Sequence, residues 1–175
     1  MHLARRVVRG ATLTRAVLVS TMLLASLMTP VVLMVQPAQA ESWGGLQPLK
    51  SRRVDVERLL GKPLSEGAGD DSTLRFNVAG GSVTVSFVTA KFVATKKLSP
   101  SFEGTVLQIV LQHARSSETP ESLKLIEDHA FDRQDERDVS VFRNLKDGVT
   151  YTFINGTLRT TRYSPSADQL ARSRK

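Results

Sequence analysis

Cysteine is absent from the 175-residue chain. This absence excludes a disulfide framework, thiolate metal sites, cysteine nucleophiles and lipid attachment through an N-terminal cysteine. A domain without disulfides must be stabilised by its core alone, which is feasible for a domain of roughly 130 residues. Hydrophobic residues make up 41% of the chain, and this share is sufficient for such a core.

The chain outside residues 1–40 also lacks a large excess of positive charge. The chain has 24 Lys and Arg against 17 Asp and Glu, which gives a formal net charge of +7. Four of the basic residues lie in residues 1–40, which contain no acidic residue, so the remaining 20 leave a surplus of only +3. A surplus of this size is typical of ordinary soluble domains, and we expect no nucleic-acid partner.

Catalytic signals are scarce as well. The chain has three histidines and no Gly-x-Ser-x-Gly nucleophile motif. Only His113 and His129 lie outside residues 1–40, and His113 falls at the end of an expected strand. We therefore predict a protein that is not an enzyme. An exported hydrolase that uses one of these histidines with a serine and an acid from residues 127–138 remains an alternative.

Metal and cofactor signals are equally weak. Residues 127–138 are rich in Asp and Glu, but arginines interrupt them and no ligand spacing is recognisable, so a solvated loop is favoured. The glycine- and acid-rich residues 67–71 match neither a phosphate-binding loop nor an EF-hand. We expect no metal and no cofactor.

One long hydrophobic run is present, and it lies near the N-terminus. A basic stretch, A-R-R-V-V-R-G, precedes an apolar run over residues 16–35, and Ala38-Gln39-Ala40 follows. This order predicts a signal peptide over residues 1–40, with cleavage before Glu41. Because the run is also long enough to span a bilayer, an uncleaved anchor through residues 16–35 is the alternative. Either possibility places the remaining chain outside the cytoplasm, in the periplasm or the exterior.

The best-delimited element of the exported part is a short helix over residues 52–60. Ser51 is a preferred N-cap residue, and Gly61, two residues before a proline, is a typical C-terminal stop. The apolar residues recur on one side, as expected for an amphipathic helix. The predicted buried side consists of Val56, Leu59 and Leu60.

Alternating apolar residues then predict strands. Residues 74–78 and 83–87 form an expected β-hairpin, and residues 104–111 the next strand. A short strand over residues 139–142 precedes a hairpin around Asn155-Gly156, the pair that a type I′ turn favours. This turn predicts that Phe153 pairs with Leu158 and Tyr151 with Thr160. Residues 114–138 are compatible with either a short helix or an edge strand.

These elements predict an α+β fold, in which the short N-terminal helix packs on a mostly antiparallel sheet of about five or six strands. The predicted organisation is a signal peptide or N-terminal anchor over residues 1–40, a single α+β domain over residues 41–166 and a flexible basic tail over residues 167–175.

The chain resembles a family of uncharacterised exported bacterial proteins that open with W-x-G-L-x-P-L-x-S and continue to L-L-G-K-P. The matching ends here are residues 43–63 and 148–167. The first of these segments also distantly resembles the SmpA/OmlA family, the BamE-type small proteins of the bacterial outer-membrane assembly machinery. That resemblance implies a helix-plus-antiparallel-sheet fold and protein binding, without catalytic residues. The residues that match the BamE-type pattern are Leu49, Ser51, Val56, Leu59, Leu60, Gly61, Lys62 and Pro63.

We therefore predict a non-catalytic extracytoplasmic binding or scaffold domain whose partner is an envelope protein or an extracellular component. Its contact surface is expected on the second face of the sheet or on the loops at 64–73 and 94–103. The alternative is attachment to an anionic surface through basic side chains, and Trp43 is either a core residue or an exposed aromatic of the contact surface. The candidate partner surface comprises Trp43, Lys96, Lys97, Arg159 and Arg162.

Overall fold

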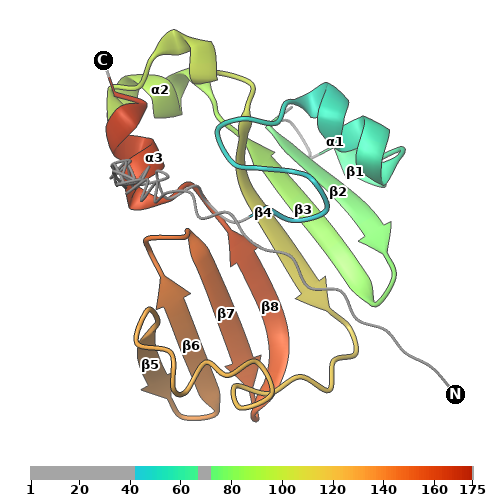
Figure 1. Cartoon of the computed structure of the whole chain (residues 1–175). Coiled ribbons are helices and arrows are strands. Elements are labelled where there is room, and N and C mark those ends of the chain that lie inside the picture. Colours follow the sequence, from blue (N-terminus) through green and yellow to red (C-terminus); the bar gives the residue numbers. More distant parts are fainter. Residues whose placement is uncertain (1–41, 67–71, 175) are drawn as a thin grey trace, which may run out of the picture. The chain divides into compact units, whose positions relative to one another are not determined.

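The computed structural model describes residues 42–66 and 72–174, so the predicted signal peptide and the loop at 67–71 lie outside the described residues (Figure 1). The described part is mostly β. Its eight strands form one sheet in the order β1-β2-β3-β4-β8-β7-β6-β5, in which all neighbours are antiparallel. The elements are α1 (Arg53–Leu60), β1 (Ser65–Glu66), β2 (Thr73–Val78), β3 (Gly81–Phe87), α2 (Ala90–Lys96), the 3-10 helix η1 (Pro100–Phe102), β4 (Val106–His113), β5 (Asp132–Glu136), β6 (Val139–Asn144), β7 (Val149–Ile154), β8 (Thr157–Tyr163) and α3 (Ala167–Arg172).

The prediction of an α+β fold with a helix packed on five or six strands is wrong. Only Val56 of α1 is buried, whereas Leu59, predicted to be buried, is 45% exposed. The extended segment before the helix covers the sheet instead. Its Leu46 is fully buried, and Leu49 is 7% exposed and donates its backbone N–H to the carbonyl of Val106 at 2.7 Å. A helix of eight residues therefore adds little to the core.

The N-terminus of α1 also differs from the prediction. The N-cap residue is Arg52, whose backbone N–H donates to the Asp55 carboxylate at 3.0 Å. The buried Ser51, which was predicted to cap the helix, accepts instead from the backbone N–H of Gln47 at 2.9 Å. The predicted stop is confirmed, because Gly61 has φ +81° and lies at the C-cap.

Two hydrophobic clusters lie on one side of the sheet, which we call the covered face. The first belongs to β2, β3 and β4 and includes Phe76, Val83 and Ile109, with Val56 and Leu46 packed over them. The predicted hairpin over residues 74–87 is confirmed, and its apolar side faces this cluster. The second cluster lies on β6, β7 and β8, beneath the segment 118–131; its buried members are Leu125, Phe142, Phe153 and Leu158.

A register shift in the last hairpin decides which residues of β8 reach each face. Asn155 and Gly156 have φ values of +51° and +72°, so the predicted turn is confirmed. Phe153 pairs with Leu158 as predicted, but Tyr151 pairs with Thr161 rather than Thr160. The pairing shifts between Thr152 and Phe153, as in a β-bulge, and every residue of β8 beyond the shift therefore changes sides.

The C-terminal end and the segment before β6 are more regular than predicted. Residues 132–136 form the exposed edge strand β5, so this half of the acidic run is a strand and not a loop. Residues 167–172, which belong to the predicted flexible tail, form α3, and Ser166 caps it by accepting from the backbone N–H of Gln169 at 3.1 Å. No helix within 42–66 and 72–174 is long and apolar enough to cross a bilayer.

Candidate functional site

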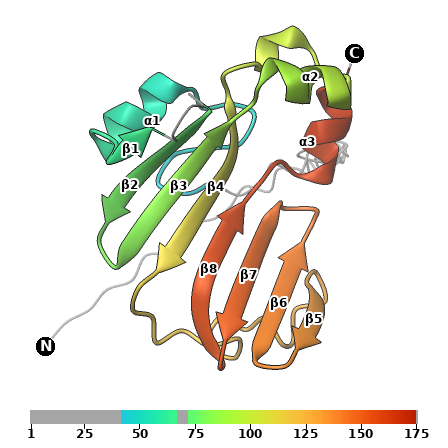
Figure 2. The same cartoon turned by 180° about the vertical axis from the view of Figure 1, so that it is seen from behind.

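The side of the sheet opposite the two clusters, which we call the open face, is the first candidate surface. Figure 2 views the sheet from this side, and the helices lie beside or behind the strands in that view. Residues that pair directly in antiparallel strands project to the same side of a sheet. The strand register therefore defines which side chains share the open face.

One continuous row of paired residues crosses the open face. Three arginines belong to it, from β2, β6 and β8, and we call this set the arginine row: Arg75, Arg143 and Arg162. Arg162 reaches this face because of the register shift in β8; without the shift it would lie on the covered face with Phe153. The successive members of the row are Arg75, Thr84, Val110, Arg162, Thr150, Arg143 and Asp132.

A second row of paired residues runs beside the first, and its side chains are mostly amides and hydroxyls. One hydrogen bond ties it to the arginine row, and a second lies within it. Arg75 Nη2 donates to Ser82 Oγ at 3.5 Å, and Ser82 Oγ donates to Gln112 Oε1 at 3.3 Å. The members of the second row are Asn77, Ser82, Gln112, Thr160, Thr152, Val141 and Gln134.

The charges of the open face are unevenly distributed. Arg75, Arg143 and Arg162 are all exposed, and the acidic side chains of this face, Asp132 and Glu136, lie on the edge strand β5. Within the described part of the chain, Arg143 and Arg162 have no ion pair. Arg143 has Asp132 as its paired neighbour on the edge strand, whereas Arg75 and Arg162 have no acidic side chain paired with them in the row.

The ion pairs that the structure does contain lie elsewhere. In α1, Arg53 contacts Glu57 at 2.9 Å and Arg58 contacts Asp55 at 2.8 Å. Near the sheet edge, Arg133 contacts Asp135 at 2.9 Å, on the opposite side of β5 from Asp132. Hydrogen bonds from Ser140 and Arg133 hold the pKa of Asp135 below its usual value.

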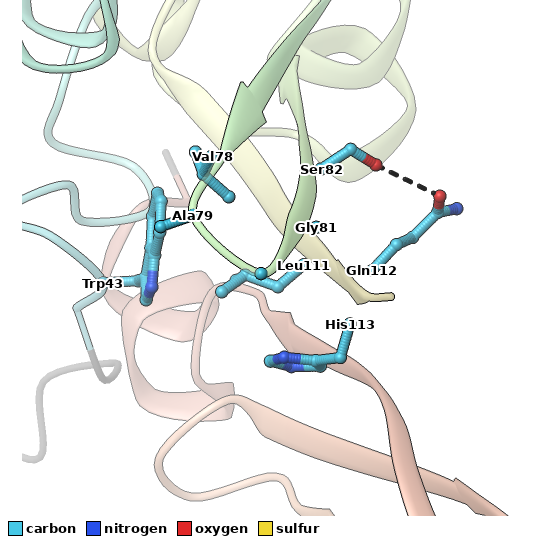
Figure 3. Close-up of a pocket in the computed structure, with 9 residues that line it drawn as sticks. Trp43, Val78, Ala79, Gly81, Ser82, Leu111, Gln112 and His113 are labelled. Carbon is cyan, nitrogen blue, oxygen red and sulfur yellow. Dashed lines mark hydrogen bonds between the residues drawn. The ribbon is translucent and has the colours of Figure 1, made fainter. Parts of the chain in front are cut away.

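A small hollow of about 280 Å³ lies where β3 begins and β4 ends (Figure 3). In Figure 3 the Trp43 indole stands on one side of it and the His113 ring on the other, with Leu111 between them. This volume is near the lower limit for ligand sites, so it accommodates a group of about one ring. The lining residues are Trp43, Val78, Ala79, Gly80, Gly81, Ser82, Leu111, Gln112 and His113.

His113 is bonded within the covered face. Its Nε2 lies 2.9 Å from Thr161 Oγ1. Burial lowers the pKa of His113, and the charge of Glu118 opposes this change without reversing it. Thr161 is only 3% exposed, so its hydroxyl is inaccessible to a substrate. The pair therefore orients the histidine and offers no reachable nucleophile. His113 is the last residue of β4, so its predicted position at a strand end is confirmed.

No family model matches this chain, and no curated protein matches it. Among solved structures, it is similar to a DUF4309 family protein, YjgB from Bacillus subtilis. The sequence identity is 14%, the match covers 74% of this chain and 88% of that one, and the TM-score is 0.48. The resemblance to the BamE-type family therefore stays a prediction.

The structure does not gather the candidate partner residues into one surface. Lys96 and Lys97 are exposed at the end of α2, and Trp43 is half-buried against the first cluster. Arg159 is exposed near the Asn155-Gly156 turn, whereas Arg162 lies in the arginine row. Among the described residues, no group of three or more His, Asp or Glu side chains is placed to hold a metal ion.

Sequence reasoning missed Arg75 and Arg143 as candidate residues. Arg75 shows a signal in hindsight, because it alternates with the buried Leu74 and Phe76 and must face the other side of β2. Arg143 has the same relation to Phe142. Their membership of one row with Arg162 depends on strand order and register, which local patterns do not contain.

Proposed function

We propose that this chain is a non-catalytic binding domain that acts outside the cytoplasm and contacts an envelope or extracellular component through the open face. The observation that supports this proposal most is the difference between the two sides of the sheet, since one side forms the core and the other does not. Both hydrophobic clusters lie on the covered face, whereas the open face carries exposed polar and charged side chains on β2, β4, β8, β6 and β5. A face that is not needed for the core is available for binding.

The location rests on the sequence of residues 1–40. Its basic start, apolar run and Ala38-Gln39-Ala40 have the order of a secretory signal. The absence of cysteine is compatible with an exported domain that depends on its core. N-terminal sequencing of the protein recovered from the cell exterior or periplasm tests this part, and a start at Glu41 is the expected result.

Site-specific photocrosslinking of the tagged full-length chain in its host tests the surface. A photoreactive residue is placed at Asn77 or Gln112, which are exposed on the open face, and at Lys91 or Leu145 as exposed controls elsewhere. We expect the same adduct at both open-face positions and its absence at both control positions.

Two results would contradict the proposal. One is an adduct that forms equally well at Lys91 or Leu145, because the contact would then not depend on the open face. The other is no adduct at Asn77 or Gln112 in cells where the protein is exported and folded. Circular dichroism of each purified variant establishes that the fold is intact.

A further inference from the structure

On the assumption that the proposed function holds, the spacing of the arginine row limits which kinds of anionic partner can bind the open face. Neighbouring strands lie about 4.8 Å apart. Arg143 and Arg162 are separated by two strand spacings, or about 10 Å, and Arg162 and Arg75 by three, or about 14 Å. A single small anion cannot contact guanidinium groups at these separations together, whereas a chain with repeated anionic groups can.

We propose that the open face binds a linear anionic polysaccharide, which lies along the arginine row and crosses the strands. The acidic groups of the polymer contact Arg75, Arg162 and Arg143 in turn. Each guanidinium presents its N–H donors in a planar fork that fits a sulfate, phosphate or carboxylate group. Because all three arginines are exposed, the polymer reaches them without a change in the sheet.

The side chains around the row favour a polysaccharide over an acidic protein. Amide and hydroxyl groups of Asn77, Gln112 and Thr160 lie beside the arginines and can exchange hydrogen bonds with sugar hydroxyls. Protein interfaces depend instead on buried aromatic anchors at their centre. The large hydrophobic side chain that is exposed on this face, Ile154 at 39%, lies in the last position of β7, away from the row.

A lipid surface also fits the open face less well, because the rows of this face lack exposed apolar side chains that could insert into a membrane. Stable attachment of a peripheral protein to a membrane combines apolar insertion with charge. Exposed apolar side chains such as Val54, Leu64 and Leu145 lie on α1 or in connecting segments, outside both rows of the open face.

The test compares two triple variants of the full-length chain with equal losses of charge. Arg75→Gln, Arg143→Gln and Arg162→Gln together remove the arginine row. Lys91→Gln, Lys96→Gln and Lys97→Gln together remove three exposed cations from α2 and its C-cap, and Lys96 and Lys97 belong to the alternative anionic-surface hypothesis. The probes are dextran sulfate and uncharged dextran of the same length, poly-glutamate, and vesicles that contain phosphatidylglycerol.

We expect dextran sulfate to bind the wild-type protein and the α2 variant with similar affinity. Removal of the row should weaken binding about tenfold or more, since three exposed charge contacts are lost together. The dependence of affinity on salt should also decrease, because fewer counterions are released on binding. Uncharged dextran should not bind measurably.

If the two triple variants lost the same amount of affinity for dextran sulfate, the proposal would be overturned, because binding would then depend on net charge alone. If poly-glutamate bound as tightly as dextran sulfate and its binding also required the arginine row, the choice of a polysaccharide would be overturned. If the protein bound the vesicles but not dextran sulfate, the proposal would be overturned in favour of a membrane. The photocrosslinking experiment separates these results from a failure of the proposed function. A row-independent adduct at Asn77 and Gln112, together with no affinity for dextran sulfate, would reject this inference and leave the open face as the contact surface.

Discussion

At the scale of single residues, His113 is a side chain whose charge state the fold influences through burial. It lies on the covered face at the end of β4, and its Nε2 is hydrogen-bonded to Thr161 Oγ1. Burial disfavours the charged imidazolium, and the pKa of His113 is therefore lowered from its ordinary value of 6.5. The neutral imidazole is the form that fits this position at neutral pH.

This lowered pKa predicts a loss of stability in mildly acidic solution. As the pH falls through about 6.5, the unfolded chain takes up the His113 proton before the folded chain does. The free energy of unfolding should therefore decrease below pH 6.5, and the His113→Gln variant, which stays neutral, should show a smaller decrease. Urea denaturation between pH 7.5 and 5.5 measures both slopes.

The matched control is His129→Gln, since His129 is exposed. Its pH dependence should follow that of the wild type. The carboxylates with lowered pKa values, Asp55, Glu121 and Asp135, lose their stabilising contribution only at pH values below about 4.5, outside this window. An unchanged slope in His113→Gln would show that the histidine does not stay neutral in the fold.

At the scale of elements, substitutions in α1 test how much a short helix contributes to the stability of a sheet protein. Val56 is fully buried within the first cluster, whereas Val54 in the same helix is 70% exposed. We expect Val56→Ala to lower the free energy of unfolding by about 2 kcal/mol, from lost apolar burial and the cavity left behind. Val54→Ala should change it by less than about 0.5 kcal/mol. Chemical denaturation of both variants measures the difference, and equal effects would contradict this packing.

Local signals were sufficient for the hairpins and insufficient for the sheet. Alternation over residues 74–87 and the Asn155-Gly156 turn encode pairing between neighbours in sequence, and both were predicted. The β4–β8 pairing joins strands about 50 residues apart, and it unites the two halves into one sheet of eight strands. No local pattern specifies such a contact, and the number of strands was therefore underestimated.

The register shift in β8 explains why the arginine row was not predicted. The unshifted pairing of Tyr151 with Thr160 would place Arg162 on the covered face, among apolar side chains. The observed pairing with Thr161 places Arg162 on the open face, opposite Thr150 and Val110. A single extra residue in one strand thus changes the side on which the charge lies, and the sequence pattern alone does not reveal it.

At the scale of the whole described unit, two separate hydrophobic clusters share one sheet. The β4–β8 ladder joins their strands over residues 109–112 and 160–163, and Tyr163 of β8 packs against the first cluster. A loss of packing in the second cluster is therefore transmitted to the first through β8. We expect the two halves to unfold together and not as independent units.

The single tryptophan allows a direct measurement of this coupling. Trp43 packs against the first cluster, so its fluorescence reports on that half, whereas circular dichroism reports on the strands of both halves. Phe153→Leu in the second cluster should destabilise the protein by about 1 kcal/mol and shift the denaturation midpoints of both signals equally. The exposed neighbour Ile154, substituted by Ala, should leave both midpoints nearly unchanged. A fluorescence transition that stays at the wild-type midpoint while the dichroism transition moves would show that the halves unfold separately, and that the β4–β8 ladder does not couple them.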